Sequence, residues 1–268
     1  MTTFVKFGGS VITDKRIPES ADYDAIKRLA QAVAEARQLR PSMRLVLSHG
    51  SGSFGHVAAA KYGVHKGLLP EADWYGFAAT SGAALRLNRI VVDALLAAHV
   101  PALSLQPSTT IETAQRQVVT WNTSHIERAL AYRMVPVVHG DVSFDMQQGC
   151  AIASTEMLLQ WLCGVPNLAP SRIILVGESA VFTADPHKDA NAQRIPVISK
   201  RNIHLVMASA GASYGIDVTG GMASKVELMW RLVQQLPQLQ VWFVRPDPKV
   251  LIPLLAGETI NEGTVMHL

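Results

Sequence analysis

Short runs of branched and aliphatic residues alternate along the whole chain with longer segments of helical periodicity. Such an alternation predicts a mainly parallel sheet with helices packed on it. The expected strands are 3–7, 43–48, 101–105, 135–139, 172–176 and 240–244. The expected helices are 22–39, 73–98, 124–133, 154–163 and 221–235. The region 177–218, rich in Gly, Ser, Ala, Asp and Pro, is expected to form loops and short elements.

The composition fits a protein with a large buried core. Apolar residues make up 49% of the 268 residues and charged residues 17%, which excludes a disordered chain. Many α/β folds of this length form one continuous body. We therefore expect a single α/β domain over residues 1–268, with two approximate lobes, 1–165 and 166–268.

The charge distribution and the cysteine content indicate which classes of partner to exclude and which cellular compartment to expect. The net charge is only +3 and the Lys and Arg residues are scattered, so we expect no binding to nucleic acid. No leader pattern is present, and no apolar stretch reaches roughly 18 residues, the length of a membrane span. Cys150 and Cys163 lack metal-ligand spacing and are interpreted as buried residues of a reducing compartment. We expect a cytoplasmic protein with no membrane partner.

Three glycine-rich turns stand at the ends of expected strands or the starts of expected helices. They are 8–10, which follows Lys6, then 49–56, which ends in a histidine, and 217–225, which ends in a lysine. Glycines let backbone N–H groups approach an anion closely, and a helix start adds positive charge. Each turn alone also has a purely structural interpretation, and none has Walker spacing. Because ligands bind at the carboxyl ends of strands in such sheets, we expect the turns to converge on one polyphosphate.

The order and content of these motifs resemble a known family. The segments that resemble the ordered motifs of the amino acid kinase superfamily are 6–10, 49–56, 139–142 and 217–225. A narrower resemblance, to its isopentenyl phosphate kinases, lies in 53–56, 140–145 and 151–156. This resemblance implies a three-layer αβα sandwich with an open, mainly parallel, eight-stranded sheet. It also implies ATP-dependent phosphorylation of isopentenyl phosphate, with Mg²⁺, by a homodimer that binds the acceptor in lobe 1–165 and ATP in lobe 166–268.

The resemblance also implies roles for individual residues. Lys6 and Lys225 would stabilise the transferring phosphoryl group, with Lys15 reaching the same oxygens. His56 would donate a hydrogen bond to the acceptor phosphate, a feature that separates isopentenyl phosphate kinases from acetylglutamate and carbamate kinases. The expected ATP-binding residues are Gly8, Gly9, Ser10, Asp185, Thr219, Gly220, Gly221 and Lys225. The expected acceptor-binding residues are Gly50, Ser51, Gly52, Gly55, His56, Phe77, Ile152 and Ser154. The metal ligands stay open.

One segment departs from the family pattern. In 176–186 a residue is missing relative to the usual Val-Asp-Gly-Val form, and Ala180 replaces its glycine. The nucleotide contacts of this loop are therefore left open, whereas the three phosphate turns are intact.

The residue types suit transfer to an acceptor that is itself a phosphate. Phosphoryl transfer depends mainly on positioning and on neutralising charge, which lysines and backbone amides supply. A phosphate monoester, whose second pKa is about 6, is ionised at neutral pH and needs no general base. Of the nearby acids Asp141, Asp145 and Glu156, we favour Glu156 for orienting the lysines or holding Mg²⁺ through water. A helix-start acid favoured by the dipole is an equal alternative.

The acceptor's apolar tail requires an apolar wall. The segment beginning near Asp73 offers Trp74, Phe77, Ala78 and Ser81 at helical spacing, and Ile152 is a second candidate. Most aromatic stripes of this kind belong to an ordinary core.

Other functions compete with this interpretation. A kinase for a phosphonate of the fosfomycin type shares the fold and the histidine, and a polar acceptor pocket would favour it. A nonenzymatic nucleotide sensor is a second alternative, against which the presence of both Lys6 and Lys225 argues. Uridylate kinase ranks last because no base-reading contacts are evident.

Overall fold

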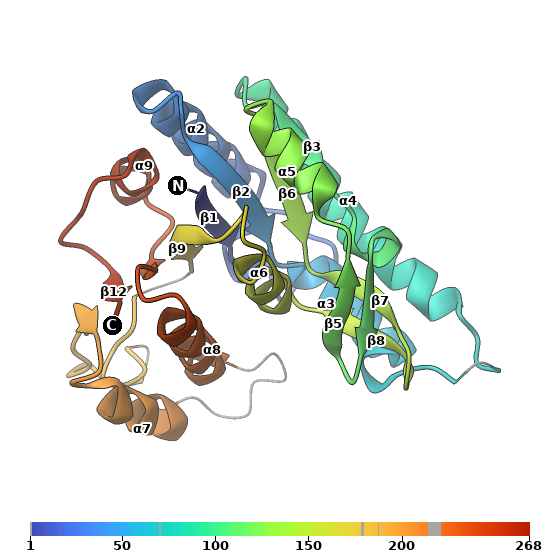
Figure 1. Ribbon diagram of the computed structural model, residues 1–268. Coiled ribbons are helices and arrows are strands. Elements are labelled where there is room, and N and C mark those ends of the chain that lie inside the picture. Colours follow the sequence, from blue (N-terminus) through green and yellow to red (C-terminus); the bar gives the residue numbers. More distant parts are fainter. Residues whose placement is uncertain (1, 70, 178–179, 187, 214–220) are drawn as a thin grey trace.

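The computed structural model describes residues 2–69, 71–177, 180–186, 188–213 and 221–268. Its centre is an eight-stranded sheet (Figure 1). The strands, in spatial order, are β10 (Val197–Ile198), β12 (Thr264–Met266), β11 (Gln240–Val244), β9 (Pro170–Val176), β1 (Thr2–Phe7), β2 (Arg44–His49), β6 (Val135–His139) and β3 (Ala102–Ser104). Neighbouring strands are parallel except β11 and β12, which are antiparallel.

A second, smaller sheet has four strands. In spatial order they are β5 (Gln117–Trp121), β4 (Ile111–Ala114), β7 (Asp141–Asp145) and β8 (Gly149–Ala153). Two antiparallel hairpins are joined by a parallel pair, β4 and β7. Because β7 begins two residues after the last residue of β6, this sheet extends outward from the carboxyl edge of the large one.

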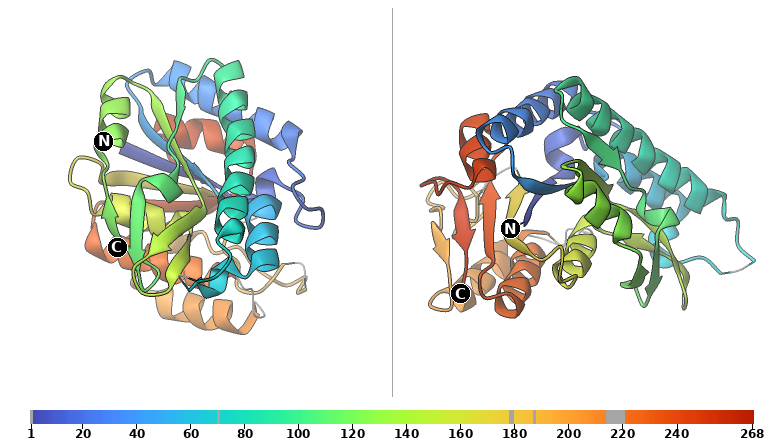
Figure 2. Two further views of the ribbon diagram at one scale, coloured as in Figure 1. Left: turned by 90° about the vertical axis from the view of Figure 1, so that its right-hand side faces the viewer. Right: turned by 45° about the horizontal axis from the view of Figure 1, so that its top comes forward.

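Helices cover both faces of the large sheet (Figures 1 and 2). The α-helices are α1 (Gly9–Ile12), α2 (Tyr23–Leu39), α3 (Gly52–Tyr62), α4 (Tyr75–Ala97), α5 (Ser124–Ala131), α6 (Thr155–Cys163), α7 (Ile203–Ser213), α8 (Gly221–Gln235) and α9 (Pro248–Ala256), with 3-10 turns at Val64–Lys66 and Pro107–Thr109. One core joins α2, α4 and α9 to the sheet, and a second core joins α5, α6 and α8 to the opposite face. The fold is a three-layer αβα sandwich.

Alternate residues of the first strand, β1, contribute to the cores on the two faces of the sheet. All six residues of β1 are buried, as in a strand covered on both faces. Val5 and Phe7 belong to the core beneath α2 and α4, whereas Phe4 belongs to the core beneath α6 and α8. Side chains alternate between the two faces of a strand. Lys6 therefore shares the face of Phe4 and lies on the side of α6 and α8.

The predicted fold class is confirmed, and all six expected strands and five expected helices are present. The prediction of loops and short elements over 177–218 was incomplete because α7 lies within it. Apolar and small residues lie all round α7, so its sequence has no polar stripe to mark a helix. The short strands of the second sheet, together with α9 and β12, were also not predicted.

Two further expectations concern cysteines and membranes. Cys150 and Cys163 are both buried and unpaired, as predicted. Among the helices of the described residues, none has the length and apolar character needed to cross a membrane.

Candidate functional site

Four strands of the large sheet end in one row. Phe7 of β1 is paired with His49 of β2 and with Val176 of β9, and His49 is paired with His139 of β6. Backbone hydrogen bonds hold the residues that directly follow this row. The N–H groups of residues 8, 50 and 140 donate to the carbonyl oxygens of Val176, Phe7 and His49, respectively. The two glycine-rich turns after β1 and β2 therefore emerge side by side, as the sequence predicted, and Gly140 after β6 lies next to them.

The turns after β1 and β2 are in backbone contact. A Cβ on Gly9 would lie 2.7 Å from the backbone nitrogen of Gly52, and a Cβ on Gly50 would lie 2.9 Å from that of Gly9. On the other side, a Cβ on Gly8 would lie 2.9 Å from the carbonyl oxygen of Val176. No side chain fits between these backbones, so glycine is required for the two turns to meet.

Replacing Gly9 by Ala is expected to force the two turns apart, because backbone atoms of Gly52 cannot rotate away from the added methyl group. We expect a loss of about 1–3 kcal/mol in the free energy of unfolding, as for overpacking elsewhere. Denaturant unfolding measures it. The matched control is Gly82→Ala on α4, whose Cβ would meet only the Arg86 guanidinium at 3.6 Å. A Gly9→Ala protein as stable as this control would contradict the steric account.

Lys6 forms a salt bridge with Glu156 at the start of α6. Ser154 caps this helix, because its Oγ accepts a hydrogen bond from the Met157 N–H at 3.2 Å. Strand alternation aims Lys6 at the same helix, and both partners are mostly buried, with side-chain exposures of 10% and 19%. Glu156 therefore lies at the helix start that the sequence predicted and contacts Lys6, whereas its role in orienting a lysine stays a prediction.

Lys225 acts on the same carboxylate from a third element. It lies in the first turns of α8, which begins at Gly221. Burial acts to raise the pKa of Glu156, but the charges of Lys6 and then of Lys225 outweigh it and hold this pKa below its usual range. The charges of the two lysines singled out in the sequence therefore act on one acid, although the lysines are 219 positions apart along the chain.

Replacing Glu156 by Gln tests this electrostatic arrangement. Because the pKa of Glu156 is lower in the folded chain than in the unfolded chain, its carboxylate stabilises the fold above its unfolded pKa of about 4.3. That contribution disappears as the pH falls through the folded pKa. We expect the variant to lose about 1–3 kcal/mol at pH 7, and the difference from wild type to shrink on acidification. Urea unfolding at pH 7 and pH 4 would contradict the account if the difference were unchanged or grew.

His56 lies on the first turn of α3, close to the glycine turn. Its Nδ1 lies 2.8 Å from the carbonyl oxygen of Gly52, and the residue is exposed. A carbonyl oxygen only accepts hydrogen bonds, so Nδ1 carries a proton. Close packing shapes this turn, since a Cβ on Gly55 would lie 2.5 Å from the Ser51 side chain. With Nδ1 occupied, Nε2 of His56 is the nitrogen left to meet an anion, and it donates only from the imidazolium form.

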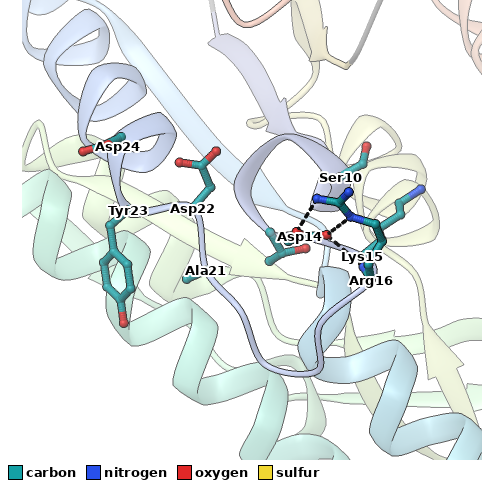
Figure 3. A pocket seen from close by; sticks show the side chains of 9 residues that line it. Ser10, Asp14, Lys15, Arg16, Ala21, Asp22, Tyr23 and Asp24 are labelled. Atoms are coloured by element: carbon teal, nitrogen blue, oxygen red, sulfur yellow. Dashed lines mark hydrogen bonds and ion pairs between the residues drawn. The ribbon is translucent and has the colours of Figure 1, made fainter.

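A cavity of about 750 Å³ opens beside Ser10 and Lys15. Figure 3 shows its lining side chains, with Arg16 joined to Asp14 by hydrogen bonds of 2.8 to 3.0 Å. Residues 14–22 form the loop that carries Lys15. Arg86 on α4 forms an ion pair with Glu19 of this loop, and the N–H of residue 20 donates to Ser53. Lys15 is exposed and lines the same cavity as Ser10, and its predicted place near the phosphates stays a prediction.

An aromatic cluster lies between the start of α4 and the small sheet, formed by Trp74, Phe77 and Phe144. The rings of Phe77 and Phe144 stack with centroids 4.6 Å apart, and Trp74 lies 5.7 Å from Phe77. Trp74, Phe77 and Ile152, three of the predicted wall residues, pack against the same small core. Phe144 on β7 is 52% exposed, so the cluster presents an open aromatic surface. The sequence did not single out Phe144, because it reads as an outward residue of a short strand.

The remaining acids near the motifs have structural partners. Asp141 accepts hydrogen bonds from the Val142 N–H and the Ser108 N–H, at 2.8 and 3.2 Å, and burial raises its pKa. Asp145 accepts from the N–H groups of Arg116 and of residues 147 and 148, which closes the β7–β8 hairpin. Within the described ranges, no group of three or more His, Cys, Asp and Glu side chains could hold a metal ion.

Some predicted ATP-binding residues have other partners or lie outside the described residues. Asp185 is 3.6 Å from Lys188 in an ion pair. Thr219 and Gly220 lie outside the described residues. In the altered loop, Ala180 and Val181 are buried, and the Val181 N–H donates to Thr264.

The fold and the cluster of lysines at the carboxyl edge fit an α/β phosphotransferase. The chain belongs to the amino acid kinase family, whose family model matches residues 1–241. It is 31% identical to the isopentenyl phosphate kinase of Methanocaldococcus jannaschii, over 85% of this chain and 86% of the relative. It is 35% identical to that of Methanothermobacter thermautotrophicus, over 86% of each. A solved isopentenyl phosphate kinase superposes with a TM-score of 0.81 at 30% identity, over 99% of this chain and all of the other. The family resemblance drawn from the motifs is confirmed.

Proposed function

We propose that this protein transfers the γ-phosphoryl group of ATP to isopentenyl phosphate, giving isopentenyl diphosphate and ADP. The observation that carries the proposal is the contact between two glycine turns, one preceded by Lys6 and the other followed by His56. It supports a donor phosphate and an acceptor phosphate held next to each other. The relatives named isopentenyl phosphate kinase support this acceptor over other phosphates.

The proposed reaction is a direct in-line transfer. An ionised oxygen of the acceptor phosphate attacks the γ-phosphorus of ATP, a new P–O–P bond forms, and the bond to the β-phosphate oxygen breaks. Lys6 and Lys225 offset the charge on the transferring group, and Glu156 holds Lys6 in place before ATP binds. His56 Nε2–H donates to the acceptor phosphate and lowers the repulsion between two anions.

Mg²⁺ and ATP are proposed to bind together. The ion commonly takes one or two carboxylates and substrate phosphate oxygens as ligands. Glu156 is the candidate to hold it through water, because the charge of Lys6 keeps its carboxylate ionised. When bound, the ion offsets phosphate charge.

The tail of the acceptor is proposed to lie against Phe77 and Ile152. Both belong to the apolar cluster around Val142, and the stacked ring of Phe144 extends that surface outward. A five-carbon chain has no polar group for such a wall to satisfy, whereas a hydroxylated or nucleoside acceptor would leave polar groups unpaired there.

The remaining organisation is also proposed rather than measured. Lobe 1–165 holds the aromatic cluster and the glycine turn 49–56, which ends in His56 and is called the acceptor turn. Lobe 166–268 contributes Lys225 and the nucleotide site. A cytoplasmic homodimer that binds no nucleic acid agrees with the family resemblance and with the low, dispersed charge. Light scattering of the purified protein tests the dimer.

Initial rates with a panel of acceptors test the assignment. The panel comprises isopentenyl phosphate, dimethylallyl phosphate, fosfomycin, uridine monophosphate and N-acetylglutamate, each with ATP and Mg²⁺. We expect the highest kcat/KM with isopentenyl phosphate. A higher value for fosfomycin or uridine monophosphate would keep the kinase and refute the acceptor. Absence of phosphorylation with every acceptor of the panel would refute the proposal as stated and favour a sensor or an untested acceptor.

A further inference from the structure

His49, the last residue of β2, connects the acceptor turn to the buried interior. Its side chain is fully buried, and its ring stacks on that of His139 with centroids 5.6 Å apart. Nδ1 of His49 lies 3.0 Å from the carbonyl oxygen of Gly50, and Nε2 lies 3.1 Å from Nδ2 of Asn88 on α4. Asn88 also accepts a hydrogen bond from the Ser104 hydroxyl. The family resemblance gives this ring no role.

In the series of hydrogen bonds that runs from Gly50 through His49 and Asn88 to Ser104, the partners fix which atom donates and which accepts. The carbonyl oxygen of Gly50 can only accept, so Nδ1 of His49 carries the proton. Burial lowers the pKa of His49 to about 4, so the ring is neutral at physiological pH and Nε2 has only a lone pair. Nε2 therefore accepts from the amide of Asn88, whose oxygen in turn accepts from Ser104. Only one orientation of Asn88 satisfies both of its neighbours.

This series of hydrogen bonds determines which backbone group of the acceptor turn faces the ligand. The peptide between residues 50 and 51 is trans, so its C=O and N–H groups point in opposite directions. Holding the Gly50 carbonyl against His49 thus turns the N–H of Ser51 the other way. The preceding peptide is held as well, because the His49 carbonyl accepts from the Gly140 N–H at 3.0 Å and the Thr155 hydroxyl at 2.9 Å. Glycine at position 50 would otherwise permit the peptide to rotate.

We infer that His49 is a positioning residue that fixes the Gly50–Ser51 peptide so that its N–H, and not its carbonyl, meets the acceptor phosphate. The inference rests on the proposed acceptor role of the glycine turn. His49 itself does not contact the substrate. A rotated peptide would direct a carbonyl oxygen at the phosphate, replacing an attractive contact with repulsion between two acceptors. The ring stacked on His139 and the bond to Asn88 keep His49 in the required tautomer and orientation.

Two substitutions at position 49 separate positioning from packing. In His49→Asn the side-chain amide replaces Nδ1–H and can still donate to Gly50, whereas in His49→Gln the amide reaches the level of Nε2 and the bond to Gly50 is lost. Both remove the ring and should lower thermal stability by similar amounts. We expect His49→Gln to raise the KM for isopentenyl phosphate about 10-fold or more, the usual effect of losing a hydrogen bond to a charged group, with little change in the KM for ATP. His49→Asn should retain most of the acceptor affinity.

Nitrogen-15 NMR of histidine-labelled wild-type protein gives an answer that depends on no variant. We expect a protonated, pyrrole-type Nδ1 and an unprotonated, pyridine-type Nε2 for His49, unchanged between pH 6 and 8; the peak is assigned by its loss in His49→Asn. The opposite tautomer, or equal acceptor KM values in His49→Gln and wild type, would overturn the inference. A wild-type protein that fails to phosphorylate isopentenyl phosphate would instead refute the proposed function and, with it, the acceptor role of the turn.

Discussion

Replacing Lys6 by Met is expected to lower kcat for phosphoryl transfer by about 10³-fold or more, the scale of a cationic side chain that stabilises a transferring phosphoryl group. Met keeps most of the aliphatic stem, so packing against the core under α6 and α8 changes little. The loss should appear in kcat because the charge matters most in the transition state. A coupled assay for ADP formation with saturating substrates measures it.

Two controls separate this charge from its structural role. Lys27→Met on α2 makes the same change at an exposed position and should leave kcat unaffected. Lys6→Met also leaves Glu156 without its salt-bridge partner, which is expected to cost stability. The double variant Lys6→Met with Glu156→Gln should recover that stability and stay inactive. Recovery of activity in the double variant would show that Lys6 serves only to neutralise Glu156.

Replacing His56 by Ala is expected to lower kcat/KM for the acceptor by about 10²- to 10³-fold, as for the loss of one donor to a developing oxyanion. The KM for ATP should change little, because His56 belongs to the turn after β2 rather than the turn after β1. Since Nδ1 is bonded to Gly52, Nε2 donates only when the ring carries both protons. Acceptor kinetics of the variant and the wild type at pH 7 measure the effect.

The variant His56→Gln distinguishes this donor from a base. It places an amide donor near the position of Nε2, but an amide cannot take up the proton that a general base removes. We expect His56→Gln to recover part of the acceptor kcat/KM that is lost in His56→Ala. A Gln variant as slow as the Ala variant at pH 7 would indicate a general base instead.

The sequence predicted the large sheet because its strands are buried on both faces and read as uninterrupted apolar runs. It did not predict the four-stranded sheet, because runs such as β5 mix exposed and buried residues over only five positions. Helix α7 was missed for the opposite reason, since its residues show no contrast between faces. Each failure lies where the apolar pattern is short or uniform, and there tertiary contacts determine the structure.

The candidate site was predictable where local motifs carry it. Glycine turns after strands identified the edge of the sheet where two of these turns meet, and the acid after Ser154 and Thr155 identified the partner of Lys6. The bond between His49 and Asn88 was not predictable, because 39 residues separate them and their contact depends on how α4 packs on the sheet. A polar residue in the apolar stretch of α4 was the available signal, since a buried amide requires hydrogen-bond partners.

Phosphorus-31 NMR of one reaction mixture tests the central claim most directly. Wild-type protein, ATP, Mg²⁺ and isopentenyl phosphate are combined, with Lys6→Met protein in a parallel sample. We predict that the monophosphate resonance of the acceptor disappears, that two coupled diphosphate resonances replace it, and that ADP forms in equal amount. Unconsumed isopentenyl phosphate, with ATP either intact or hydrolysed to inorganic phosphate, would contradict the account.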